Sequence, residues 1–168
     1  ACAALRLAAE TPGPVYVRMG RASVPAVYAP DVELELGKAY VIDEGTDVSI
    51  IACGLEVTEA RKAAEKLAEE GISAEVIDAF SVKPLDAETI LASLAKTGCA
   101  VVAEEHSVYG GLCSAVSELC AESQPTPLEF VAVRDRFGKS GEFEELMAYF
   151  GLDAASIVQA AKKVLMRK

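Results

Sequence analysis

The chain's only histidine lies in the stretch VVAEEHSVYGGLCSAV, residues 101–116, directly after two acidic residues. An imidazole beside Glu104 and Glu105 could accept or donate a proton in general acid/base catalysis. His106 also follows an apolar strand pattern, where a polar side chain commonly secures the turn from a strand into a helix. Because no second histidine and no nucleophile stand at a recognisable spacing, a structural or interface role for Glu105 and His106 is favoured over proton transfer.

Gly110 and Gly111 follow in the same stretch, directly before a helical pattern. Glycines at a helix start let the backbone approach a ligand closely, and the free N–H groups there favour an anion. The pair lacks the GxGxxG and GxxxxGK[ST] spacings of phosphate-binding loops, and the neighbouring acids would repel an anion. Close packing of helix on strand is therefore the favoured role of the two glycines, with a small-anion site as the alternative.

Two arginines stand three residues apart in VYVRMGR, residues 15–21. A guanidinium is a permanently charged, forked donor that suits a phosphate or a carboxylate. We expect a strand here, in which alternation places Arg18 and Gly20 on one face and Arg21 on the other. One arginine could then bind substrate while the other serves a structural ion pair, and a solvated surface position is the alternative for each.

The segment RDRFGKSGEFEEL, residues 134–146, combines polar residues with one aromatic near the start of a helical pattern. Ser140 is expected to cap that helix, since a serine side chain can accept from the first free N–H groups. No histidine base stands at a recognisable distance from Ser140, which argues against a nucleophilic serine. Phe137 is expected to anchor the loop in a groove.

Strand and helix patterns that must position these residues alternate after about residue 46. Each β-branched run is followed by residues with helical spacing. Asp86 and Asp153 stand where helix N-caps are expected, and the helix after Asp86 is expected to end near Gly98. Such alternation predicts a mainly parallel sheet, and residues 38–42 are expected to pair antiparallel with the following strand at an edge. The expected fold is an α/β fold with an open mixed, mostly parallel sheet and helices on both faces.

The N-terminal part of the chain has a different pattern. Residues 1–21 are interpreted as the end of a preceding domain, residues 22–36 as a linker that contains two prolines, and residues 37–168 as the main domain. The chain begins without methionine and within a helical pattern, so we expect it to be a piece of a longer protein.

Composition excludes several classes of protein. A hydrophobic content of 52% in 168 residues is enough for one core, whereas a net charge of -10 disfavours binding to nucleic acid. No apolar run approaches the roughly 20 residues that span a membrane. The five cysteines lack CxxC spacing, so neither a disulfide framework nor a metal site is expected, and a reducing cytoplasm fits best.

Taken in order, several segments resemble the C-terminal portion of a transketolase, and most closely the bacterial split type. These segments are GPVYVRMGR, DVSIIACGLEVTEARKAAEKLAEEGISAEVIDAFSVKPLD, VVAEEHSVYGGLCSAVSEL and RDRFGKSGEFEELMAYFGLDAASIV. The resemblance implies an enzyme with thiamine diphosphate and Mg²⁺ that transfers a two-carbon ketol unit between sugar phosphates. It also implies a homodimer that works with an N-terminal transketolase subunit or domain.

The resemblance further implies that residues 1–21 end a pyrimidine-binding domain and that residues 37–168 form the transketolase C-terminal domain. Arg21 matches the arginine that grips the sugar phosphate, and Arg18 is a second candidate. The family's GDG…N motif and its activating glutamate are missing, which implies no catalytic or cofactor-binding residue here and an inactive, mainly structural and dimer-forming chain.

In this family the EEH…GG segment lies in a domain remote from the thiazolium. The resemblance therefore implies that Glu105, His106, Gly110 and Gly111 shape domain packing and the dimer. The beta component of a 2-oxo acid dehydrogenase and deoxyxylulose phosphate synthase share this framework and are alternatives. A non-enzymatic module that binds a small anion or a protein is an alternative of another class.

Overall fold

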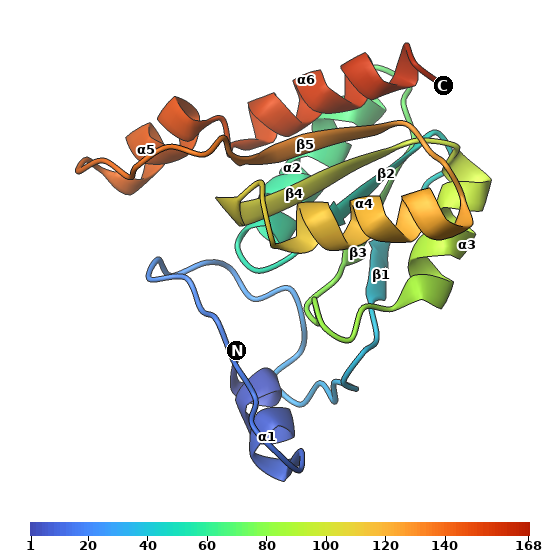
Figure 1. Ribbon diagram of the computed structural model, residues 1–168. Coiled ribbons are helices and arrows are strands. Elements are labelled where there is room, and N and C mark those ends of the chain that lie inside the picture. Colours follow the sequence, from blue (N-terminus) through green and yellow to red (C-terminus); the bar gives the residue numbers. More distant parts are fainter.

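A five-stranded sheet forms the centre of the protein, in a computed structural model that describes all 168 residues (Figure 1). The strands lie in the order β1-β3-β2-β4-β5, and only β1 runs antiparallel to its neighbour. Their bounds are β1 Tyr40–Asp43, β2 Val48–Ala52, β3 Ala74–Asp78, β4 Ala100–Ser107 and β5 Leu128–Val133. The predicted open, mostly parallel α/β sheet is confirmed.

Helices cover both faces of this sheet (Figure 1). Alternate residues of β2 face opposite sides: Val48 and Ile50 belong to a core shared with α2 and α6, whereas Ile51 belongs to a core shared with α3 and α4. The helices are α1 Cys2–Glu10, α2 Glu56–Glu69, α3 Ala87–Thr97, α4 Leu112–Ser123, α5 Phe143–Phe150 and α6 Ala154–Leu165. None of them is both long and apolar enough to cross a bilayer.

The predicted helix ends that depend on local chemistry are confirmed. Asp86 accepts a hydrogen bond from Thr89 N at 3.1 Å at the start of α3, and Asp153 accepts one from Ser156 N at 2.9 Å at the start of α6. Gly98 ends α3 in the left-handed conformation, with φ of 71°, which glycine adopts without a steric cost.

The prediction for the edge strand was right about its direction and wrong about its partner. β1 pairs with β3, with Tyr40 opposite Asp78, and not with β2. After β1 the chain crosses the start of β3, where Thr46 N and Asp47 N both donate to Ser73 O. Gly45 makes this crossing possible, since a Cβ there would lie 2.2 Å from the carbonyl carbon of Ala74. β2 therefore pairs with the edge of β3 that is opposite to β1.

Three further local predictions were wrong. Residues 15–21 form no strand, because no neighbouring strand lies beside them and residues 12–28 make no backbone–backbone hydrogen bond. Ser140 does not cap α5, which begins after Glu142 and has no side-chain cap. Phe137 does not fill a groove, since its side chain is 97% exposed.

We call residues 1–37 the N-terminal arm and residues 38–168 the body. The arm contains α1, which has no buried residue and stands apart from the helices that cover the sheet (Figure 1). Several contacts fasten the arm. Val27 packs against the core on the α2 side, and the Tyr28 hydroxyl donates to Asp78 Oδ2 at 2.8 Å. Glu35 N donates to the Tyr40 hydroxyl at 2.9 Å, and Gly37 N donates to Ser81 Oγ at 3.2 Å. The arm therefore meets the body near the carboxyl end of β3.

Candidate functional site

The carboxyl edge of the parallel strands is the place where open α/β sheets usually bind ligands. Cys53 follows β2 here, Asp78 ends β3, and Glu104, Glu105 and His106 lie in the last part of β4. Because the arm also passes this edge, most of the candidate residues from the sequence gather at one place.

Glu104 fastens β4 to α4. Its side chain is 3% exposed, and its two carboxylate oxygens accept from Leu112 N and Cys113 N, each at 2.8 Å. A carboxylate at this position satisfies free amides and faces the positive end of the helix dipole. A Cβ on Gly111 would lie 2.1 Å from Glu104 Oε2, so Gly111 leaves the space in which this carboxylate sits.

This role of Glu104 was not predicted from the sequence. The available signal was an acid at the end of an apolar strand, eight residues before a glycine-led helix. The geometry also bears on the small-anion alternative at Gly110 and Gly111. The first two amides of α4 already bind a carboxylate, so a free anion would have to displace Glu104 or lie against its charge.

His106 lies within β4 and not after it. Its Nδ1 donates to the carbonyl oxygen of Ser107 at 2.8 Å and lies 3.9 Å from Glu104 Oε2. The ring is thereby held by its own strand, close to the carboxylate that secures α4. This arrangement suits a packing role for the histidine.

Two carboxyl groups at this edge are buried with incomplete hydrogen bonding. Glu56 is fully buried and neither of its oxygens has a partner. Burial, followed by the charges of Glu59, Glu105 and Asp153, raises the pKa of Glu56 to about 9. This carboxyl group is therefore protonated at neutral pH.

Burial also raises the pKa values of Asp78 and Cys53. Asp78 Oδ1 has no partner, and burial raises the pKa of this group to about 6, although the hydrogen bond from Tyr28 lowers it. Burial, and then the charges of Glu104 and Asp78, raise the pKa of the Cys53 thiol to about 12. A thiol with that pKa is not a nucleophile at neutral pH. No group of histidine, cysteine and acidic side chains could hold a metal ion.

The structure brings Arg18 together with Glu105 and His106, and it leaves Arg21 outside this group. Arg18 lines a pocket of about 390 Å³ with these two residues, Arg136 and an apolar wall from α5. Gly20 also faces this side, since a Cβ there would lie 3.1 Å from Glu105 Oε2. Arg21 is exposed and has no hydrogen-bond or ion-pair partner, so its guanidinium is free to bind an anion.

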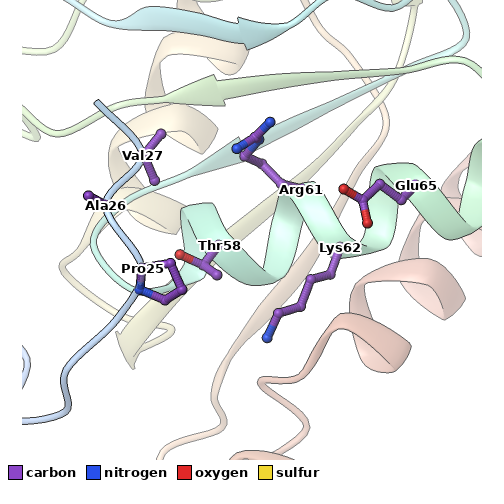
Figure 2. A pocket seen from close by; sticks show the side chains of 7 residues that line it. All are labelled: Pro25, Ala26, Val27, Thr58, Arg61, Lys62 and Glu65. Atoms are coloured by element: carbon purple, nitrogen blue, oxygen red, sulfur yellow. The ribbon is translucent and has the colours of Figure 1, made fainter. Parts of the chain in front are cut away.

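A second pocket, of about 180 Å³, lies between residues 25–27 of the arm and α2 (Figure 2). The cations beside it already have partners: Arg61 donates to Asp43 at 2.9 Å, and Lys62 donates to Glu59 at 2.7 Å. The buried hydroxyl of Thr58 has no partner and points toward the arm at Pro25 (Figure 2). This pocket lies at the boundary between arm and body, and neither of its two cations is unpaired.

Comparisons with known proteins agree with this architecture. Residues 37–157 match the family described as the transketolase C-terminal domain. The 6-deoxy-6-sulfo-D-fructose transketolase subunit SqwH of Clostridium sp. (strain MSTE9) is 48% identical over 93% of this chain and 48% of its own length. An apulose-4-phosphate transketolase subunit of Phocaeicola vulgatus is 42% identical over 94% of this chain and 50% of its own.

A solved structure is similar over nearly the whole chain. This split-gene transketolase, described as an inactive beta4 tetramer, matches with a TM-score of 0.94 and 46% identity over 98% of this chain and 54% of its own. The chain thus spans about half the length of these relatives. By the family match and by its fold, the chain belongs to the transketolase C-terminal domain family and is the C-terminal part of a split transketolase-family enzyme.

Proposed function

We propose that this chain contributes to an enzyme that transfers a two-carbon ketol unit between sugar phosphates with thiamine diphosphate and Mg²⁺. The observation that carries the proposal is the similarity to transketolase subunits, at 42–48% identity over more than nine-tenths of the chain. One of these relatives is named for a sulfofructose and the other for a phosphorylated sugar. Each of these two names denotes a sugar with a strongly acidic group, a sulfo group or a phosphate. An exposed arginine can bind such a group.

Thiamine diphosphate does not fit the residues of this chain. A diphosphate needs free N–H groups or cations. Glu104 occupies the first amides of α4, Arg18 shares its pocket with the Glu105 carboxylate, and Arg21 is left for the sugar phosphate. The adjacent carboxyls of Glu56 and Asp78 are incompletely hydrogen-bonded, and no group of side chains suits a metal ion. We therefore assign the cofactor and its Mg²⁺ to other parts of the enzyme and derive no catalytic step through them here.

Arg21 is the residue proposed to bind the phosphate of the sugar. Its guanidinium is exposed and unpaired, whereas Arg61, Arg134, Arg136 and Arg167 donate to acceptors within the body. Arg6 and Arg18 are unpaired as well, so the resemblance of Arg21 to the arginine that grips the sugar phosphate is what singles it out.

The proposed assembly is a homodimer of the complete protein that acts with an N-terminal transketolase subunit or domain. The word "subunit" in the names of the relatives supports a second chain, and the inactive beta4 tetramer supports self-association and inactivity without a partner. In this arrangement residues 1–21 end a pyrimidine-binding domain, residues 22–36 link the domains, and the body holds the assembly together. Five free cysteines suit a cytoplasmic location.

The test is an assay of the full-length protein with its N-terminal partner, cofactor and Mg²⁺. We expect ketol transfer from xylulose 5-phosphate to ribose 5-phosphate, and none from this subunit alone. Decarboxylation of pyruvate or branched 2-oxo acids would favour a 2-oxo acid dehydrogenase component instead. Turnover of sugars by the lone subunit would overturn the assignment of the cofactor.

The role of Arg21 has its own test in the same assay. We expect Arg21→Ala to raise KM for sugar phosphates by roughly 10-fold to 150-fold, which corresponds to the loss of one charge-assisted hydrogen bond. Arg6→Ala, at another exposed arginine of the arm, is the matched control and should leave KM unchanged. An unchanged KM in Arg21→Ala would remove this residue from the site.

A further inference from the structure

Gly20 brings the arm into close contact with the end of β4. A Cβ at this position would lie only 3.1 Å from Glu105 Oε2, so the backbone of the arm passes directly over that carboxylate. Residues 12–28 make no backbone–backbone hydrogen bond that could hold this segment. Side-chain interactions must therefore determine where the segment lies.

Arg18 and Glu105 have opposite charges and neither has another partner. Both line the pocket of about 390 Å³ between the arm and the ends of β4 and β5, and neither forms a hydrogen bond or an ion pair within 4 Å. Behind Glu105 lies the buried carboxyl of Glu56, whose two oxygens also lack partners. Glu56 is protonated at neutral pH and Arg136 in the same pocket donates to Tyr149 O, so Glu105 is the one negative charge that lines the pocket with Arg18.

The positions of the two arginines follow the alternation of an extended chain. Arg18 lines the pocket and Gly20 lies against Glu105, whereas Arg21 does not line the pocket, although all three residues are exposed. A contact at Arg18 therefore sets the direction in which Arg21 points. A substrate phosphate at Arg18 itself would face the Glu105 carboxylate, which disfavours a direct substrate contact there.

We infer that Arg18 is a positioning residue: its attraction to Glu105 across the pocket holds the arm on the body and presents Arg21 to the sugar phosphate. This inference rests on the proposed function. It replaces a substrate contact for Arg18 with an electrostatic contact between arm and body, and it gives Glu105 a defined partner.

The experiment is a double-mutant cycle in the assembled enzyme, with KM and kcat measured for sugar phosphates. Arg18→Ala and Glu105→Gln should each raise KM about twofold to fivefold, the usual worth of a solvent-accessible ion pair, with little change in kcat. The double variant should be no worse than either single variant. Neither change should have a further effect in the Arg21→Ala background.

A direct phosphate contact by Arg18 would give a different pattern. Glu105→Gln would then lower KM or leave it unchanged, because it removes a negative charge beside the bound anion. Arg18→Ala and Arg21→Ala would also add their effects. Either result would overturn the inference. Glu122→Gln, at an exposed and unpaired acid of α4, is the matched control and should change nothing.

A readout independent of activity separates this inference from the proposed function. Trypsin cleavage after Arg21 in the full-length protein should become about twofold to fivefold faster in Glu105→Gln, and not in Glu122→Gln, because a released arm reaches the protease more often. Equal cleavage rates in an enzyme that transfers ketol units would overturn the inference alone. Faster cleavage in a protein without that activity would support the arm contact and reject the function.

Discussion

The arm and the body of this protein differ in how their structure is determined. All 43 buried residues lie in the body, and none lies in residues 1–37. The body contains the complete sheet and both apolar cores, whereas the arm is fixed through a few side chains such as Val27 and Tyr28. The proposed substrate residue, Arg21, nevertheless lies in the arm.

This difference separates what the body supplies from what the arm supplies. Changes at the buried groups of a packed α/β unit lower its free energy of unfolding. An exposed segment tolerates changes and can carry a binding residue. The acidic edge of the body gives the arm a charged surface to lie against. The following variants test this division. Changes at buried groups of the body should lower the free energy of unfolding, whereas changes in the arm should have small effects on it.

Gly111→Ala should have the largest effect, because it acts on the fastening of β4 to α4. The new Cβ would lie 2.1 Å from Glu104 Oε2 and would push this buried carboxylate off the amides of Leu112 and Cys113. We expect the free energy of unfolding to fall by about 3–5 kcal/mol, the cost of a buried charge without its partners. Urea denaturation measures the change.

Gly138→Ala is the control for this variant, since a Cβ at position 138 meets nothing within 4 Å. Its effect should stay below about 0.5 kcal/mol. Similar losses in the two alanine variants would mean that Glu104 does not hold the start of α4.

Glu56→Gln should have an effect that is small at acidic pH and grows as the pH rises. The folded protein keeps a proton on Glu56 up to about pH 9, whereas the unfolded chain releases it near the ordinary pKa of 4.5. The folded state thus binds more protons between these values, so the stability of the wild-type protein falls as pH rises through that window. A neutral glutamine removes this loss.

The stability of Glu56→Gln relative to wild type should therefore rise with pH, by up to about 1.4 kcal/mol per pH unit for a single proton. Thermal unfolding at several pH values below 9 measures the slope. Glu69→Gln, at an exposed acid of the same helix, should show no such slope. Parallel pH profiles for both variants would place Glu56 in contact with solvent.

The sequence predicted the parts of the body that depend on near neighbours. Asp86 and Asp153 cap helices three residues away, and Gly98 ends its helix, so a local pattern contains all the required information. The partner of β1 was mispredicted because it depends on Gly45 passing the backbone of Ala74, a contact between distant segments.

The candidate site was harder to predict for the same reason. Its acidic residues stood out in the sequence, but the fastening role belongs to Glu104, which acts on amides eight and nine residues away. In the arm, the alternation of Arg18 and Arg21 could be predicted although the strand that was expected to carry them does not form. Side chains of an extended segment alternate in direction even where the segment makes no hydrogen bonds to another strand. A β-strand, in contrast, requires a neighbouring strand.

Tyr28→Phe tests the fastening between arm and body and should have a smaller effect again. It removes the hydrogen bond to Asp78 Oδ2, and Asp78 Oδ1 already lacks a partner. Because the pKa of Asp78 is about 6, the group is charged above that pH and then loses its remaining donor. We expect a loss of about 1 kcal/mol near pH 7.5 and a smaller one near pH 5, where the acid is protonated.

The sign follows from the shift of Asp78, since removal of the Tyr28 hydroxyl raises the pKa of Asp78 further above its ordinary value. Stability is then lost more steeply as pH rises. Tyr109→Phe is the control, because Tyr109 is 69% exposed and its hydroxyl has no partner. Equal losses at both pH values would separate the arm contact from the ionisation of Asp78.

Tyr16→Ser should have the smallest effect, because this arm residue is 87% exposed. We expect the free energy of unfolding of the chain to change by less than about 0.5 kcal/mol, whereas Leu94→Ala in the body should cost about 2–5 kcal/mol. A loss above about 1 kcal/mol for Tyr16→Ser would mean that the arm packs as part of the body. If Tyr16→Ser instead weakens association with the N-terminal partner, then that partner buries Tyr16. The arm would then obtain its structure from the assembly, whereas the body obtains its structure from its own core.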